Sequence, residues 1–264
     1  MAAQHRTTLW ILLYFGLLIG GLSTMLLDEL GWVAFTIYYA GMPLGALLLW
    51  RLCRGSFSIP GILPYRGVVH HFILGTTGSL AAVLLVYGAL RAAGWLHITT
   101  LNWTIAGLVI GVAAQQFVVA VIEEFTFRGV IQTLFSHSTG PSRGLLIASS
   151  LFGLFHLPNI LHQGVRGLYI PLTVAVLTLM GIVFGWAFAR TNQHLALPVA
   201  LHFGWNTACF GLEAVHDFSF SGPGWLTGVA EWFPESGVMG ALGLGVLGLL
   251  VHRLTLKPLR VWNE

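Results

Sequence analysis

The sequence predicts an all-α fold, a polytopic membrane bundle of about eight transmembrane helices, and its composition gives the first reason. Of the 264 residues, 56% are hydrophobic and only 8% are charged. The mean hydropathy is +0.82. A soluble domain carries about a quarter charged residues, so this chain has too few to cover a water-facing surface. We therefore expect an integral membrane protein in which residues 1–264 form a single membrane domain.

Apolar runs of about 20 residues, each long enough to cross a bilayer as a helix, give the second reason. The candidate spans are about 8–27, 32–50, 70–90, 104–127, 143–157, 167–189, 194–213 and 236–254. The first run is too long for the apolar core of a signal peptide and ends without an A-x-A cleavage pattern, so we interpret it as a retained helix. The fifth run is the shortest, and the fourth continues into two glutamates.

The distribution of basic residues predicts the orientation. With the N-terminus inside, the inner loops would hold Arg6, Arg51, Arg54, Arg66, Arg143, Arg190, Arg253, Lys257 and Arg260. The outer loops would hold only Arg91 and Arg166. This positive-inside bias places both termini in the cytoplasm. The net charge of +3 does not indicate a nucleic-acid partner, because no basic run with interleaved aromatic residues is present.

Two further patterns concern packing and the membrane surface. Small residues four apart let helix backbones approach closely. Such pairs are Gly16/Gly20, Gly41/Gly45, Gly107/Gly111 and Gly181/Gly185. The outer segment 213–235 is rich in glycine, proline and aromatic residues, including Trp225, Trp232 and Phe233. We interpret it as an anchor in the headgroup zone, with a substrate gate as the alternative.

The stretch "VVAVIEEFTFRGV" (Val118–Val130) places charges where lipid should exclude them. A charge at the centre of a membrane helix costs about 2.5 to 3.5 kcal/mol. If the segment is helical, Glu124 and Arg128 are four residues apart and can pair. Glu123 points about 100° away from Glu124 and has no local partner, which suits a group that exchanges protons. The alternative is that the helix ends here and both glutamates meet headgroups.

Two later spans carry polar residues at helical spacing. Phe152 and His156 lie four apart in "LFGLFHLPN", and Pro158 interrupts the helix just after the histidine. His202 and Asn206 lie four apart in "LPVALHFGWNTACFG". Each pattern alone is also compatible with a structural histidine or an interhelical hydrogen bond.

Together the motifs E-E-x-x-x-R, F-x-x-x-H and H-x-x-x-N, in this order on three helices, resemble the CPBP family of intramembrane proteases. That family includes the type II CAAX prenyl endopeptidases and bacteriocin-processing or self-immunity proteins. Every motif position is filled, by Glu123, Glu124, Arg128, Phe152, His156, His202 and Asn206. The resemblance covers about residues 104–213, the protease core of the family, and residues 1–100 fit only as generic membrane helices.

The resemblance implies an endopeptidase that hydrolyses peptide bonds within the membrane through an activated water, without a covalent intermediate. Glu123 would be the general base, and His156 would help to hold the water. His202 and Asn206 would face the scissile carbonyl and donate hydrogen bonds to the oxyanion. Glu124 with Arg128 would fix the helix, and Phe152 would pack beside the site and limit water.

A zinc-dependent version of the same protease is the first alternative. Glu123, His156 and His202 form a ligand set suited to catalytic zinc. The HExxH arrangement is absent, and the two cysteines, Cys53 and Cys209, form no ligand-spaced pair. We expect that no cofactor is required, with zinc as the alternative.

Two non-enzymatic functions are further alternatives: a proton-coupled transporter and a bacteriocin-immunity protein that acts by binding. A transporter would show polar residues across the whole depth of the bundle, or two inverted halves, and neither is evident. The expected partners are membrane lipid and a membrane-embedded or lipidated peptide substrate, which is prenylated or not. The expected location is a prokaryotic cell membrane.

Overall fold

The computed structural model of the chain describes residues 2–25, 31–59, 61–62, 67–101, 106–229 and 236–255. Five residues on which the predicted orientation and the predicted headgroup anchor rest lie outside these ranges: Arg66, Trp232, Phe233, Lys257 and Arg260.

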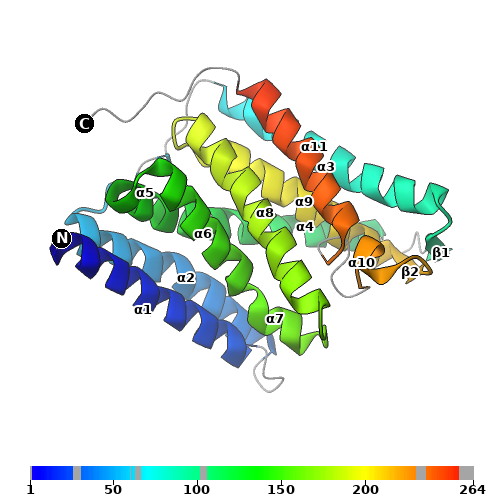
Figure 1. Ribbon diagram of the computed structural model, residues 1–264, viewed down its shortest axis with the longest axis horizontal. Coiled ribbons are helices and arrows are strands. Elements are labelled where there is room, and N and C mark those ends of the chain that lie inside the picture. The colour runs from blue at the N-terminus through cyan, green and yellow to red at the C-terminus, as the bar shows by residue number, and fades with distance from the viewer. Residues whose placement is uncertain are drawn as a thin grey trace.

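Eight long helices coincide with the eight predicted apolar runs. They are α1 (Ala2–Met25), α2 (Gly31–Arg54), α3 (Val68–Ala92), α4 (Ala106–Glu124), α6 (Pro141–Phe155), α8 (Tyr169–Arg190), α9 (Ala196–Val215) and α11 (Val238–Leu254). Shorter helical elements are η2 (Phe125–Gln132), α5 (Thr133–Thr139), α7 (Leu157–His162) and α10 (Gly224–Thr227). Successive long helices run in alternating directions through the bundle (Figure 1). The arrangement is that of a helical bundle.

Five helical segments among the described residues are long and apolar enough to cross a membrane. They are His5–Thr24, Val68–Ala92, Gly107–Thr139, Pro141–His162 and Tyr169–Arg190. Helix α11 is a shorter apolar helix. Many large apolar side chains of these helices are exposed, such as Leu17 and Ile110, which suits contact with acyl chains rather than water. The protein is therefore a multi-pass integral membrane protein.

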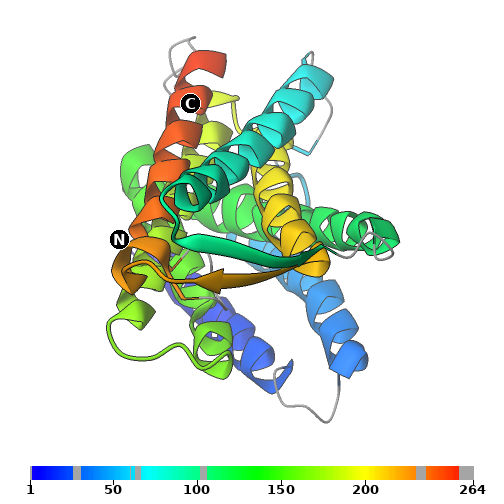
Figure 2. The same ribbon diagram turned by 90° about the vertical axis from the view of Figure 1, so that its right-hand side faces the viewer.

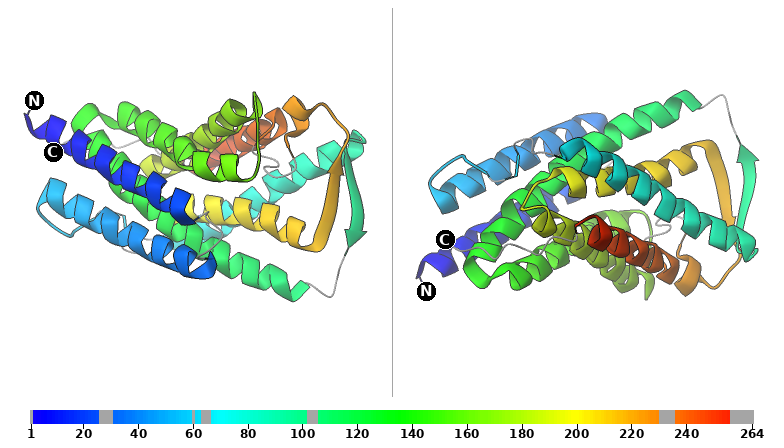
Figure 3. Two further views of the ribbon diagram at one scale, coloured as in Figure 1. Left: turned by 90° about the horizontal axis from the view of Figure 1, so that it is seen from below. Right: turned by 90° about the horizontal axis from the view of Figure 1, so that it is seen from above.

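A two-stranded antiparallel sheet corrects the prediction of a purely helical chain. Strand β1 (Leu96–Leu101) pairs with β2 (His216–Phe220), with Leu96 opposite Phe220 and Leu101 opposite His216. The strands lie at the end of the bundle opposite the N-terminus (Figure 3). Their β-branched and aromatic residues favour strands, and pairing satisfies backbone groups that no longer belong to a helix. Residues 216–220 belong to the segment that we expected to be irregular.

Several close helix contacts through glycine lie where α8 meets α6 and η2. A Cβ on Gly181 would lie 3.0 Å from the Cα of Ser149, and one on Gly185 would lie 2.5 Å from Gln132 Oε1. The predicted pairs Gly16/Gly20 and Gly107/Gly111 have nothing within 4 Å. Spacing alone therefore overstated the role of glycine, because only glycines that face another helix allow close approach.

Gly153 provides a test of this packing. A Cβ there would lie 2.7 Å from the carbonyl oxygen of Val174 and 3.0 Å from the backbone nitrogen of Thr178, so α6 and α8 would have to separate. We expect Gly153→Ala to destabilise the protein by about 1–3 kcal/mol, as overpacking does. The measurement is the unfolding midpoint of the purified protein in detergent.

The matched control is Gly88→Ala, because Gly88 is also helical and has nothing within 4 Å of its Cβ position. This variant should be neutral or slightly stabilising, since alanine has the higher helix propensity. Equal midpoints for the two variants would contradict the close approach of α6 to α8.

Candidate functional site

The helix that carries the first motif continues past the two glutamates. Helix α4 ends at Glu124, and the π-helical turn η2 follows without a break and leads into α5. The exposed fractions of Glu123 and Glu124 are 3% and 0%. The alternative in which the helix ends here and both glutamates meet headgroups is therefore wrong. A π-helical turn is rare and is often found at functional sites, where it changes the direction of side chains along one helix.

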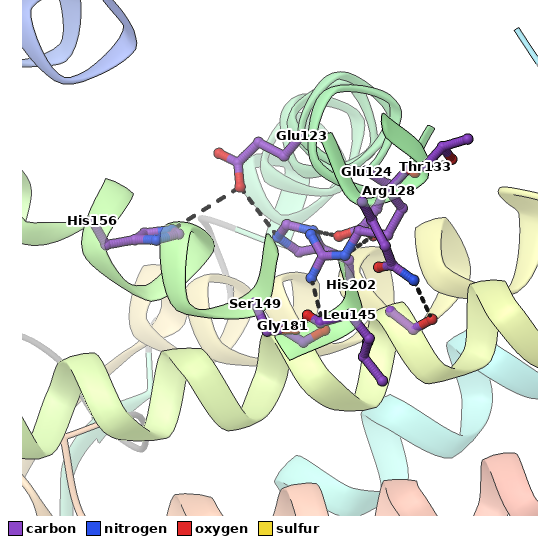
Figure 4. Close-up of polar contacts among 11 residues, drawn as sticks. Glu123, Glu124, Arg128, Thr133, Leu145, Ser149, His156, Gly181 and His202 are labelled. Atoms are coloured by element: carbon purple, nitrogen blue, oxygen red, sulfur yellow. Dashed lines mark hydrogen bonds and ion pairs between the residues drawn. The ribbon is translucent and has the colours of Figure 1, made fainter. Parts of the chain in front are cut away.

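Glu124 forms the expected ion pair with Arg128. The distance from Arg128 Nε to Glu124 Oε2 is 3.1 Å, and both side chains are buried. The guanidinium also donates a hydrogen bond of 3.4 Å to the carbonyl oxygen of Gly181. It lies over the ring of Phe152, with 4.4 Å between Arg128 Cζ and the ring centroid. These contacts, most of them drawn in Figure 4, join α4 and η2 to α6 and α8.

Glu123 points to the other side of its helix, away from Arg128 (Figure 4). Its Oε1 accepts a hydrogen bond of 3.3 Å from the hydroxyl of Tyr39 on α2. Its Oε2 is buried and has no hydrogen-bond partner among the described residues. This oxygen lies 4.0 Å from His156 Nε2 and 3.9 Å from His202 Nε2. The neighbouring glutamates therefore have different surroundings, one in an ion pair and one facing two imidazoles.

His156 lies at the break between two helices. Helix α6 ends at Phe155, and α7 begins at Leu157 with Pro158 in its first turn. The Nδ1 atom of His156 lies 2.8 Å from the carbonyl oxygen of Phe152. Because a carbonyl oxygen only accepts, Nδ1 carries the proton. The neutral ring therefore presents the lone pair of Nε2 towards Glu123.

The third motif contacts both glutamates. His202 Nδ1 lies 2.8 Å from Glu124 Oε1, so this nitrogen donates to the carboxylate that is paired with Arg128. The other ring nitrogen faces Glu123. Asn206 Nδ2 donates a hydrogen bond of 3.0 Å to Gln116 Oε1 on α4. Helix α9 is thus held against α4 by polar contacts at two levels.

A cavity of about 220 Å³ lies between the helices that carry the three motifs. Of the predicted site residues, Glu123, Phe152, His156, His202 and Asn206 line it. Glu124 and Arg128 do not belong to its lining and lie behind it. The structure thus brings all seven predicted residues together, five around a cavity and two in the ion pair that supports it.

A comparison with protein families agrees with this geometry. Residues 105–208 match the family model described as type II CAAX prenyl endopeptidase Rce1-like. The resemblance to the CAAX protease family is thereby confirmed. The matched segment contains every motif residue, from Glu123 on α4 to Asn206 on α9. No curated protein matches the chain.

The distances between Glu123, His156 and His202 show whether these three residues, as placed, could bind one zinc ion. In a tetrahedral zinc site with bonds of about 2.0–2.1 Å, ligand atoms are about 3.3 Å apart. Here Glu123 Oε2 lies 4.0 and 3.9 Å from the two Nε2 atoms. The described part of the chain contains no group of three or more His, Cys, Asp or Glu arranged to hold a metal ion. The donor types suit zinc, but the residues as placed do not fit it.

Two further residues contact the predicted site residues, Gln116 and Tyr39, and neither belongs to a motif. Gln116 lies seven residues before Glu123, and with Gln115 it forms a polar pair inside a long apolar run. Polar side chains in such a run could have indicated a contact with another helix. Tyr39 belongs to α2, outside the matched segment, and nothing in its own surroundings distinguishes it. Its contact with Glu123 depends on how α2 packs against the core.

The different surroundings of the two glutamates predict different effects on stability. Glu124→Gln leaves the buried guanidinium of Arg128 without its counter-charge, and breaking a buried pair in this way costs about 3–5 kcal/mol. Glu123→Gln removes a carboxylate that forms no close ion pair, so we expect a change below about 1 kcal/mol. Unfolding midpoints in detergent provide the comparison.

The double variant Glu124→Gln/Arg128→Met serves as the control. Removing both charges should be less harmful than removing one, because no uncompensated charge remains buried. Equal destabilisation by the two single glutamate variants would contradict the separation of their roles.

Proposed function

We propose that the protein is an intramembrane endopeptidase that hydrolyses peptide bonds of membrane-associated proteins or peptides. The family match supports a CAAX-type intramembrane protease in general. The observation that carries the finer proposal is the buried Oε2 of Glu123, which has no hydrogen-bond partner and faces two imidazoles across a cavity. The substrate is a membrane-associated peptide with or without a prenyl group.

In this mechanism the nucleophile is a water between Glu123 and His156. A separation of 4.0 Å is too long for a direct hydrogen bond and suits two acceptors that share one water. Glu123 takes a proton as the water oxygen attacks the scissile carbonyl. It then returns this proton to the departing amine as the C–N bond breaks. No covalent intermediate with the protein forms.

The oxyanion would be stabilised from α9. The amide of Asn206 has two N–H groups, and Gln116 accepts from one of them, so the other is available to the substrate. His202 uses its Nδ1–H on Glu124 and donates to the oxyanion only if Nε2 is also protonated. Removal of one oxyanion donor costs about 2.7–4 kcal/mol in a serine protease, which gives the scale of such a contact. Phe152 packs beside both histidines and limits the water that reaches them.

We also propose eight membrane crossings with both termini in the cytoplasm of a prokaryotic cell, and a single domain over residues 1–264. The alternating directions of the eight long helices support this number (Figure 1). The last turns of α2, α8 and α11 support the orientation, because they carry Arg51, Arg54, Arg190 and Arg253 at one end of the bundle.

The first test replaces the proposed base. Glu123→Gln keeps the size and the hydrogen-bonding capacity of the side chain but cannot accept the proton, so we expect cleavage to fall by about 10²–10⁴-fold. The assay uses purified protein in lipid vesicles and a library of quenched fluorescent peptides with an apolar segment, farnesylated or unmodified. The matched control is Asn192→Asp, which also exchanges an amide and a carboxylate but at an exposed position outside the cavity lining, and which should cleave normally. Undiminished cleavage by Glu123→Gln would contradict the assignment.

The second test concerns metal dependence. We propose hydrolysis without a metal and expect cleavage to survive prolonged incubation with a strong zinc chelator. The zinc-dependent alternative, with Glu123, His156 and His202 as ligands, predicts loss of cleavage and recovery on addition of Zn²⁺. Metal content measured on the same sample separates chelation from inhibition by the chelator itself.

A further inference from the structure

The cavity extends from Glu123 in one direction only. Its lining on α9 runs from His202 through Asn206 to Glu213, near the end of that helix, and its lining on α4 runs back to Gln115. Exposure rises along the same path: Glu123 is buried, Gln115 and Asn159 are half-buried, and Gln163, Phe210 and Glu213 are exposed. The mouth therefore lies at the end of the bundle to which α9 leads, where β2 follows it.

The opposite direction is closed by apolar packing. Beyond Glu123 towards Thr139, the side chains of Phe127, Val130 and Ile131 have exposed fractions of 0%, and Leu134 has 2%. Arg128 lies among them and pairs with Glu124. None of these residues lines the cavity. Among the described residues, the lining of the cavity therefore leads from Glu123 towards the mouth and not towards the opposite end.

The two ends of the bundle differ in charge. The closed end holds Arg51, Arg54 and Arg190 at the last turns of α2 and α8, and Arg143 in the first turn of α6. The mouth end holds Arg91 at the last turn of α3, Arg166 between α7 and α8, and the pair β1–β2, which crosses that end of the bundle (Figure 2). Arginine-rich loops remain in the cytoplasm, so the mouth faces the other side of the membrane.

The lining of the cavity suits an extended peptide. Neutral amide side chains contribute to it, from Gln115, Gln116, Asn159, Gln163 and Asn206. Each amide both donates and accepts, which matches the alternating groups of a peptide backbone and does not select for charge. Apolar side chains, among them Leu22 of α1 and Phe35 of α2, line the cavity as well. A cavity of about 220 Å³ is too small for a folded domain.

We infer that the substrate reaches this site from the non-cytoplasmic side of the membrane, as an extended peptide segment held by the amide and apolar side chains of the lining. That the bound peptide is cleaved rests on the proposed function, whereas the direction of access does not.

Single cysteines test the direction of access. The background is Cys53→Ser/Cys209→Ser, which removes both cysteines of the chain. On it, Gln163→Cys marks the mouth, Gln115→Cys marks the inner cavity, and Arg143→Cys marks the closed end, where the native side chain is exposed. Sealed right-side-out and inside-out vesicles are treated with a small, charged, membrane-impermeant methanethiosulfonate. Thiols that remain unmodified are then counted by a mass tag after denaturation.

In right-side-out vesicles we expect modification of Gln163→Cys and Gln115→Cys, and no modification of Arg143→Cys. In inside-out vesicles we expect the reverse. Modification of Gln115→Cys only in inside-out vesicles, or in neither preparation, would overturn the inference, because water would then not reach the cavity from the mouth. Asn159→Cys, also half-buried in the lining, replaces Gln115→Cys if that variant is not recovered in the membrane.

The same variants separate this inference from the proposed function. Bulky modification of Gln163→Cys in right-side-out vesicles should block cleavage of the fluorescent peptides, and the same reagent should leave the cysteine-free background unaffected. If no peptide is cleaved by any form of the protein, the proposed hydrolysis fails, and the modification pattern still decides the direction of access.

Discussion

The buried ion pair between Glu124 and Arg128 is the interaction on which the site depends. Two charges with almost no exposure are costly in a membrane interior, and direct pairing offsets part of that cost. Their remaining contacts extend to three other helices: Arg128 lies on Phe152 of α6 and donates to Gly181 of α8, and Glu124 accepts from His202 of α9. The pair therefore joins α4 and η2 to three of the other helices that line the cavity.

The position of Glu123 follows from that anchor. Because Glu124 is fixed against Arg128, the preceding residue on the helix must project in a different direction, towards the cavity. There it meets the hydroxyl of Tyr39 and two imidazoles rather than a cation at close range. Adjacent residues of one type thus acquire different chemistry. One carboxylate is paired with the guanidinium of Arg128, and the other faces the cavity.

The asymmetry of the cavity gives this arrangement a direction. Apolar side chains close the arginine-rich end beneath the ion pair, and amide side chains line the path to the other end. A hydrolase within a membrane needs water at its base while the surrounding helices exclude it. The cavity as described meets both conditions. Its amide side chains can hydrogen-bond water along the path to Glu123, and the buried phenylalanine, valine and isoleucine side chains beyond Glu123 exclude water. Substrate and water would then enter through the same mouth.

The sequence by itself determined the membrane character, the predominance of apolar helices, the three motifs and the pairing of Glu124 with Arg128. These properties depend on composition or on residues within about one helical turn, where helix geometry fixes which side chains are neighbours. Only the tertiary structure decided that Tyr39 contacts Glu123, that Gln116 holds Asn206, that β1 pairs with β2 and that the cavity opens at one end. The polar contacts of the site join residues 78, 84 and 90 positions apart. No local period encodes such contacts, because they arise only when helices from distant parts of the chain pack together.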